Sequence, residues 1–398
     1  MPKRNRCVHL DVLRGLAGLA VPMLHLQEGF ALSPSGDWTL DFCGHNYFAV
    51  EFYLLLMAYM FGAAYDRRWG EGMGLWDFAK RRVRRLHPLV ISGVVLGGLV
   101  FALQAAGVAW AGKSFLTGRS VGLQVLAFVA GFLMLPAWGF AYIAPLNACS
   151  WTLYYQYLGN ILYALVVRHM RSWMLAVAAA LSAVAMAVFV FHPDLNAVFG
   201  TQSGYLAHLA RRSTSFDGGW GMNDMQVTAG LVRLSFPLFF GLLVFRLGWK
   251  IRLPKALATA LVPLLFVAFM FVPAGDGGLF ALSSVWNGVL ELAFVFAVLP
   301  FLLLVGIGSD APGGRFAQVA DFFGRLSFPV YMSHFMFLPI HRHYVVQHSA
   351  NASFAANVCV FIGSYLVILL IGCCVMRFWE RVQSKLVQRL EEKVVIGV

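Results

Sequence analysis

The clearest shortage in this sequence is charge, because only 12% of its residues are Asp, Glu, Lys or Arg, against about 25% in ordinary soluble domains. Hydrophobic residues make up 60% of the chain, and the mean hydropathy is +0.73. A chain of 398 residues with this composition has too little polar surface to cover a water-soluble globule. The composition therefore predicts an all-α, polytopic membrane protein.

Several other features are absent. We find no internal repeat, no low-complexity tract and no soluble appendage, so we expect a single integral membrane domain over residues 1–380 and a cytoplasmic basic tail over 381–398. The missing repeat disfavours a transporter, since many transporters are built from related halves. No signal-peptide cleavage site follows the first apolar run, so we expect that run to be retained.

The cysteines lack the spacing of a metal site. They are scattered, and no group of His, Cys and carboxylate residues has ligand spacing, so we expect no metal. Core packing is the default interpretation of these thiols. A disulfide remains open only between Cys43 and Cys149, which fall on the same outer side in the topology below.

Apolar runs long enough to cross a bilayer, roughly 20 residues each, number about ten. They lie near residues 10–30, 46–66, 86–108, 151–168, 172–192, 230–247, 256–273, 284–306, 326–345 and 354–376. A weaker run at 122–142 is interrupted by Gly131, Pro136 and Gly139. We expect it to be re-entrant or interfacial.

The distribution of basic residues predicts the orientation. Six segments hold 23 of the 30 Lys and Arg residues, and the positive-inside rule places them all in the cytoplasm. They are the N-terminus, residues 66–85, 168–171, 246–255 and 308–325, and the tail from Arg377. For all six segments to lie on the same side, the chain must cross the membrane ten times, with both termini in the cytoplasm. The run at 122–142 then does not cross. The net charge of +12 thus reflects membrane orientation and contact with lipid, so we expect no nucleic-acid partner.

The first apolar run carries three ionisable residues. In a helix Arg14 and His25 are about 20° apart in azimuth and about 16 Å apart along the axis, and Glu28 lies near the same face. These three residues form a polar stripe along the helix. Intramembrane charge is costly unless it faces a bundle interior or a wet cavity, so the stripe predicts a cavity that runs across the membrane. The alternative is a snorkelling arginine and a hydrogen-bonded packing histidine.

The stretch LDVLRGLAGLAVPMLHL, residues 10–26, resembles the opening helix of the acyltransferase-3 family of integral membrane O-acyltransferases, in which an arginine and a histidine separated by ten residues mark the catalytic helix. Other similar stretches follow in the family's order: GHNYFAVEFYLLLMAYMFG (44–62), FAKRRVRRLHP (78–88), NACSWTLYYQYLGN (147–160), LVRLSFPLFFGLLVFR (231–246) and FGRLSFPVYMSHF (323–335). The chain departs from the pattern at Met57-Ala58, where Ser-Gly is usual, at Thr152, where serine is usual, and at Gln156, where glutamate is usual.

His25 is the candidate general base, since an imidazole with an ordinary pKa of about 6.5 can take a proton from an attacking hydroxyl. An acyl-imidazole intermediate on the same ring is the alternative. Arg14 is a candidate for holding the acyl donor or stabilising an oxyanion. Glu51 or Glu28 would orient His25. Glu291, inside a predicted span, is a further functional suspect.

The remaining candidates depend more on the resemblance. Four arginines precede the third span, and composition alone leaves two roles open for them, membrane orientation or binding of acyl-CoA phosphates; they are Arg81, Arg82, Arg84 and Arg85. The resemblance favours the phosphates. It also promotes to pore-lining candidates Trp151, Gln156, Arg233, Tyr331 and His334, which otherwise read as packed or interfacial residues.

The resemblance implies a multi-pass enzyme of the bacterial inner membrane. It would move an acyl group, in the first instance acetyl, from cytoplasmic acyl-CoA to a hydroxyl of a glycan or lipid-linked sugar on the outer side. The alternatives are a transporter or flippase of a glycan, in which the stripe gates a path without chemistry, and a catalytically altered relative, which Gln156 keeps open because an amide can only hydrogen-bond. The acceptor and the oligomeric state are left open.

Overall fold

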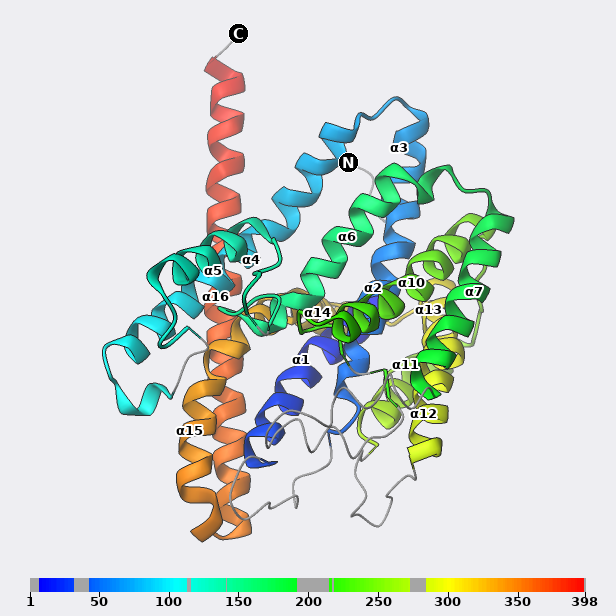
Figure 1. The fold of residues 1–398 in the computed structure, drawn as a ribbon. Helices are drawn as coiled ribbons and strands as arrows, with labels where there is room; N and C mark the ends of the chain where they lie inside the picture. The colour runs from blue at the N-terminus through cyan, green and yellow to red at the C-terminus, as the bar shows by residue number, and fades with distance from the viewer. Residues whose placement is uncertain are drawn as a thin grey trace.

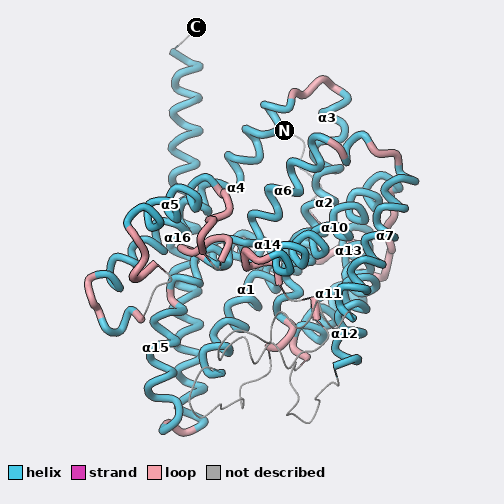
Figure 2. The backbone as a smooth tube through the Cα atoms, in the orientation of Figure 1, coloured by secondary structure: helices cyan, strands magenta, loops and turns pink. Residues whose placement is uncertain are grey.

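The computed structural model describes residues 7–31, 43–112, 116–140, 142–191, 215–216, 218–272 and 284–396, and helices dominate this part of the chain. The α-helices are α1 (Val8–Ala31), α2 (Ala49–Phe61), α3 (Arg67–Gly70), α4 (Leu75–Ala105), α5 (Val121–Leu133), α6 (Trp151–Leu165), α7 (Ser172–Phe191), α10 (Asp224–Leu247), α11 (Lys255–Met270), α12 (Ser284–Ala293), α13 (Leu299–Gly308), α14 (Gly314–Ser333), α15 (Leu338–His348) and α16 (Phe354–Ile396). Figure 2 shows helices joined by loops, with no strand in the described segments.

Short helical turns connect several of these helices. The 3-10 turns are η1 (Asn46–Phe48), η3 (Ala109–Ala111), η4 (Ala148–Ser150), η5 (Val167–His169), η8 (His334–Met336) and η9 (Ser349–Asn351). Two π-helical turns, η2 (Gly62–Asp66) and η7 (Phe294–Val298), join α2 to α3 and α12 to α13. The chain therefore continues as a helix through each pair.

Six helical segments of the described chain are long and apolar enough to cross a membrane. They are Asn46–Gly70, Leu75–Ala105, Ser172–Phe191, Asp224–Leu247, Val285–Gly308 and Phe354–Val382. Each coincides with one of the predicted apolar runs. The chain is thus an all-helical, multi-pass membrane protein, while the count of ten spans and the cytoplasmic placement of both termini stay predictions.

The weak run at 122–142 forms only a short helix. α5 has 13 residues, which gives a length of about 20 Å against a hydrocarbon core of about 30 Å. It ends at Met134, which has a positive φ of 53°. The chain then continues without regular helix to η4. A helix of this length is too short to cross.

The predicted apolar run at 326–345 is not one regular helix. The run is divided between α14, which ends at Ser333, and α15, which begins at Leu338, with η8 between them. Pro339 lies in the first turn of α15, where a missing backbone N–H costs little. The division places His334 on a turn beside α1.

α1 lies in the middle of the bundle, against α14 and α15 (Figure 1). Its contact with α14 is close because glycines replace side chains on both helices. A Cβ on Gly18 would lie 2.5 Å from the Ser327 Cβ and 2.6 Å from its Cα, and one on Gly324 would lie 3.1 Å from the Asp11 carbonyl oxygen. Small residues allow helix backbones to approach in membrane proteins. This contact holds the N-terminal half of α1 against the C-terminal half of α14.

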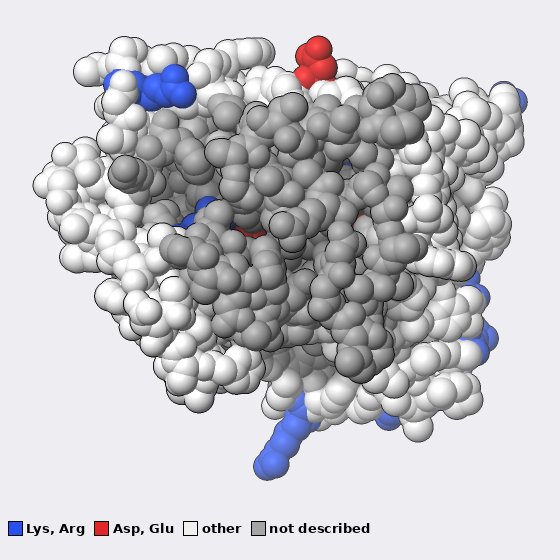
Figure 3. Space-filling model, turned by 60° about the horizontal axis from the view of Figure 1, so that its bottom comes forward, with Lys and Arg blue, Asp and Glu red and all other residues white. Residues whose placement is uncertain are grey.

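Three of the six predicted basic segments lie at the same end of the molecule. The α3–α4 link, the α6–α7 link and the C-terminal end of α16 all lie toward the top of Figure 1, and the α15–α16 link lies at the opposite end. Figure 3 brings that opposite end forward, where few of the described atoms belong to acidic or basic residues. Basic and weakly charged links thus lie at opposite ends, as expected if they alternate between the two sides of the membrane. The basic N-terminal residues lie outside the described part.

Candidate active site

The first helix presents a hydrogen-bonded pair of ionisable side chains. His25 and Glu28 are three residues apart on α1, a spacing that puts them on the same face. His25 Nδ1 lies 2.8 Å from Glu28 Oε2. Because a carboxylate only accepts, Nδ1 carries the proton in this pair and Nε2 keeps a lone pair in the neutral ring. This is the arrangement that a general base requires.

Glu28 also contacts a neighbouring helix. Arg342 of α15 approaches the same carboxylate oxygen, with Nη2 3.3 Å from Oε2. The carboxylate is thus held between an imidazole and a guanidinium. Arg342 was not among the predicted site residues. An arginine at the end of a predicted span was the available signal.

A thiol faces His25 across the bundle. Cys149 belongs to η4, directly before α6, and its Sγ lies 3.6 Å from His25 Nε2 and 3.2 Å from His334 Nε2. Cys149 is a free thiol that is 3% exposed, so the disulfide to Cys43 that the sequence left open is wrong. No sequence spacing identifies Cys149 as a site residue, because its partners are 124 and 185 residues away in the chain.

His334 completes the group. Its ring stacks on that of His25 with centroids 5.4 Å apart and planes 11° apart. Its Nδ1 lies 2.8 Å from the Tyr331 carbonyl oxygen, so this nitrogen also carries the proton. His334 is 0% exposed, whereas the His25 side chain is 23% exposed. The His334 ring is therefore shielded from solvent, and the His25 ring is accessible.

A cavity of about 90 Å³ opens beside this group. Its described lining includes residues of α1, η1, α2, η4, α6, α14 and α15, among them His25, Glu28, Cys149, Trp151, Tyr331 and Arg342. The rest of the lining is largely apolar or aromatic. The structure therefore brings four of the predicted candidates, His25, Glu28, Trp151 and Tyr331, to one cavity.

Hydrogen bonds fix η4 and its thiol in place. Asn147 Nδ2 donates to the Met332 carbonyl oxygen over 2.8 Å, and the Tyr331 hydroxyl donates to the Cys149 carbonyl oxygen over 3.0 Å. Thr152 Oγ1 lies 2.8 Å from Tyr331 Oη. The threonine that stands in the place of the usual serine keeps the hydroxyl, so this departure is chemically conservative.

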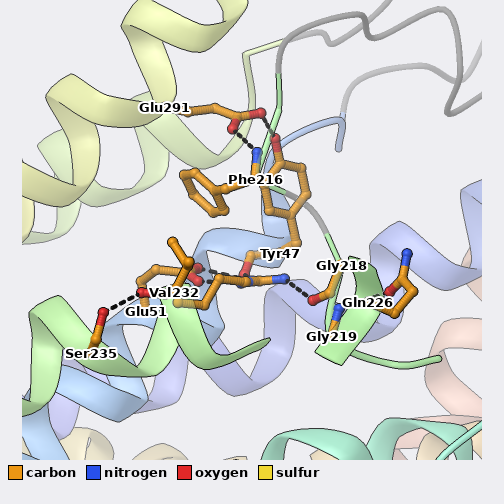
Figure 4. A network of polar contacts seen from close by, with 10 residues as sticks. Tyr47, Glu51, Phe216, Gly218, Gly219, Gln226, Val232, Ser235 and Glu291 are labelled. Atoms are coloured by element: carbon orange, nitrogen blue, oxygen red, sulfur yellow. Dashed lines mark hydrogen bonds and ion pairs between the residues drawn. The ribbon is translucent and has the colours of Figure 1, made fainter. Parts of the chain in front are cut away.

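Glu51 lies in a second polar network. It forms a buried ion pair with Arg233 of α10, in which Arg233 Nη2 donates to Glu51 Oε2 over 3.0 Å; the two side chains are 0% and 1% exposed. Arg233 also donates to the Gly218 carbonyl oxygen over 2.8 Å, and Figure 4 shows this contact from close by. The position beside His25 that the sequence offered to either glutamate is thus held by Glu28.

The same network contains Glu291. Its carboxylate accepts a hydrogen bond from the Phe216 backbone N–H over 2.7 Å and another from the Tyr47 hydroxyl (Figure 4). Asn287 donates to it over 3.0 Å. These contacts anchor the segment around Phe216 and hold Tyr47, which lines the cavity. The network supports the cavity wall.

Arg14 lies away from the cavity. It pairs with Asp11 one turn earlier, with Nη1 3.2 Å from Oδ1, and its side chain is partly exposed. Arg14 is not among the described residues that line the cavity. The predicted stripe therefore divides into a His25–Glu28 pair in the cavity and an Arg14–Asp11 pair near the start of α1.

The four arginines of α4 also have different environments. Arg81, Arg84 and Arg85 are exposed, whereas Arg82 is buried and donates to Asn160 Oδ1. The Arg82 guanidinium carbon also lies 5.2 Å from the centre of the Phe61 ring. Three of the four therefore face outward, while Arg82 holds α4 to α6.

The departures from the family pattern lie outside the cavity lining that the structure describes. Gln156 is half-buried, and its backbone carbonyl oxygen accepts a hydrogen bond from Asn160 over 2.6 Å. Met57 packs against Gly159, where a Cβ would lie 2.9 Å from the Met57 Cε, and Ala58 packs in the same way against Gly241. The side chains at 57 and 58 are thus accommodated by glycines.

The site offers one candidate metal-binding group among the described residues. The ligand atoms of His25, Cys149 and His334 all lie within 4.8 Å of one another, and such a set can bind zinc or copper. Its members are 124 and 185 residues apart along the chain. The expectation of no metal considered only sequence spacing, which cannot detect such a group.

Comparisons with known proteins agree with the motifs. No curated protein and no solved structure matches the chain. The model of the acyltransferase-3 family, described as an acyltransferase domain, matches residues 8–377, nearly the whole chain. The chain therefore belongs to the acyltransferase-3 family of membrane acyltransferases.

Proposed function

We propose that this protein is an O-acetyltransferase of the bacterial inner membrane, which takes the acetyl group of cytoplasmic acetyl-CoA and transfers it to a hydroxyl of a glycan or lipid-linked sugar on the outer side. The observation that carries the proposal is the hydrogen-bonded His25–Glu28 pair at a cavity in a chain of this family. A neutral imidazole held by a carboxylate is the usual base for activating a hydroxyl.

The pair defines the proton transfer. His25 Nε2 takes the proton of the acceptor hydroxyl as its oxygen attacks the acyl carbon, and the imidazolium that forms is stabilised by Glu28 at Nδ1. Arg342 approaches the same carboxylate oxygen from α15. Proton transfer by a positioned group contributes about 10²- to 10⁴-fold to the rate.

The cavity supports a small acyl group. A volume of about 90 Å³ accommodates an acetyl group with a few water molecules, whereas pockets for whole drug-sized ligands have about 300–1,000 Å³. The nucleotide portion of the donor would stay outside this cavity. Trp151 and Tyr331 in the wall offer aromatic surface to a sugar ring.

The outward-facing arginines of α4 are the proposed site for the donor phosphates. Guanidinium groups bind phosphate through paired hydrogen bonds, and Arg81, Arg84 and Arg85 are exposed in the N-terminal part of α4. Arg82 is excluded from this role because it is buried against Asn160.

The test is consumption of acetyl-CoA by the detergent-purified protein, with an O-acetylated sugar as the product to be identified. We expect His25→Ala to lower kcat by about 10²- to 10⁴-fold, and His348→Ala, at an exposed histidine of α15, to leave it unchanged. The pair Arg84→Ala, Arg85→Ala should raise KM for acetyl-CoA with little change in kcat, which is the signature of lost ground-state binding.

The opposite result identifies the competing function. If the wild-type protein leaves the thioester intact but moves a labelled glycan across proteoliposomes, the protein is a transporter and the enzyme assignment fails. If Gln156→Glu turns an inert wild-type protein into an active one, the chain is a catalytically altered relative.

A further inference from the structure

The proposed mechanism leaves the Cys149 thiol unexplained. It is buried at the junction of α1, α14 and α6, and two imidazole nitrogens approach its sulfur, at 3.2 Å from His334 and 3.6 Å from His25. A buried cysteine that only packs is normally surrounded by apolar atoms. Here the sulfur instead contacts two titratable rings and lines the cavity.

The hydrogen bonds of the two rings decide what the thiol can do. Each ring donates through Nδ1, His25 to the Glu28 carboxylate and His334 to a backbone carbonyl. Each Nε2 is therefore an acceptor in the neutral ring and points toward the sulfur. The thiol thus has a base on each side and can pass its proton to either of them.

The position of Cys149 in the fold also suits a nucleophile. η4 runs directly into α6, whose N-cap is Ser150, so the thiol lies in the 3-10 turn just before the N-terminus of α6. The N-terminus of a helix carries a partial positive charge that stabilises anions, and nucleophilic cysteines are typically found in such positions beside a histidine. The helix and the histidine are independent features that act in the same direction.

We propose that Cys149 is a catalytic nucleophile, which carries the acyl group as a thioester between the donor and the acceptor hydroxyl. This inference rests on the proposed acyltransferase function and divides the reaction into two half-reactions. It differs from direct transfer and from an acyl-imidazole on His25, the two mechanisms that the sequence left open.

In the first half-reaction the Cys149 proton moves to His334 Nε2 and the thiolate attacks the acyl carbon of acyl-CoA. A bond forms between that carbon and Cys149 Sγ, the bond to the CoA sulfur breaks, and the CoA thiolate leaves with the proton from His334. The products are acyl-Cys149 and CoA. One thioester replaces another, so no further reactant is needed.

In the second half-reaction His25 Nε2 takes the proton of the acceptor hydroxyl, whose oxygen attacks the acyl carbon on Cys149. The carbon–oxygen bond forms and the carbon–sulfur bond breaks. The sulfur then recovers a proton from His25, which restores the free thiol. The assignment follows exposure, because His334 is fully buried next to the sulfur whereas His25 faces the cavity.

The experiment is a rapid acid quench of the full-length purified protein after mixing with acetyl-CoA in the absence of an acceptor. Intact mass and peptide mapping identify the acetylated residue, and release by neutral hydroxylamine diagnoses a thioester. Turnover with a glycan acceptor is measured on the same preparations. The matched control is Cys374→Ala, which removes an exposed thiol of α16.

We expect one acetyl group on Cys149 in the wild-type protein and in Cys374→Ala. Cys149→Ala and the isosteric Cys149→Ser should lose turnover by about 10³-fold or more, with folding monitored by thermal unfolding. His25→Ala should still acquire the label but retain it, since only the second half-reaction needs that base. His334→Ala should acquire the label slowly.

Other outcomes would overturn the inference without affecting the acyltransferase function. They are a label on His25, or turnover by folded Cys149→Ser at a rate close to that of the wild type. A stoichiometric metal ion that disappears in Cys149→Ser would assign the three side chains to a metal site and equally exclude the covalent step. Failure of the wild-type protein to consume acetyl-CoA would refute the proposed function as well.

Discussion

Replacing Glu28 by glutamine tests the central feature of the site, the carboxylate that holds His25. The substitution keeps the size of the side chain and removes its charge. It therefore weakens the 2.8 Å hydrogen bond from His25 Nδ1 and the contact with Arg342. A hydrogen bond to a charged group is worth about 1.5–3 kcal/mol.

This range converts to a rate. At about 1.4 kcal/mol for each factor of ten, losing the charged acceptor in the transition state lowers kcat by about 10- to 150-fold. A second effect adds to the first. The glutamine amide can donate toward Nδ1, which would move the ring proton to Nε2 and remove the base; in catalytic triads this costs about 10⁴-fold. We therefore expect kcat to fall by between about 10-fold and about 10⁴-fold, with KM little changed.

The assay is the initial rate of CoA release by purified Glu28→Gln protein, with thermal unfolding as a check of the fold. Glu380→Gln is the matched control, because Glu380 also pairs with an arginine, Arg325, but both side chains are more than two-fifths exposed. The reasoning is refuted if folded Glu28→Gln keeps kcat within about threefold of the wild type, a difference worth less than 1 kcal/mol.

Two further substitutions test the scaffold that holds this site. Arg233→Ala leaves the buried Glu51 carboxylate without its partner, so we expect a loss of about 3–5 kcal/mol in stability, against less than about 1 kcal/mol for Arg325→Ala in an exposed pair; similar melting temperatures for the two variants would contradict this. Gly18→Val places a Cβ 2.5 Å from the Ser327 Cβ, so it should separate α1 from α14 and cost about 1–3 kcal/mol or more, with loss of acyl transfer. Gly363→Val, where a Cβ meets nothing within 4 Å, should be neutral, and equal activity of the two valine variants would show that the close contact is dispensable.

Part of this description could be predicted from the sequence because it depends on local properties. Apolar runs and the alternation of basic segments follow from the hydrocarbon thickness and from the cost of moving charge across it. The pairing of His25 with the residue one turn later follows from helix periodicity. The family resemblance added His334 and Tyr331 to the candidates, and the structure places both beside Cys149.

Other parts were decided only by tertiary packing. Sequence could not show which of four adjacent arginines turns inward, since that depends on Asn160 of another helix. Nor could it choose between Glu28 and Glu51 as the partner of His25, because the answer depends on Arg233, which is 182 residues from Glu51.

The sequence by itself determined the helices, their apolar character and the polar pair on the first of them, because these depend on residues within a few turns of one another. The tertiary structure alone decided that a thiol from the start of α6 lies between histidines of α1 and η8. Glycines let α1 and α14 approach closely, and beyond this contact the rings of His25 and His334 stack with centroids 5.4 Å apart. Whether these three side chains meet depends on how the helices pack across the bundle, which the spacing of residues along the chain does not reveal.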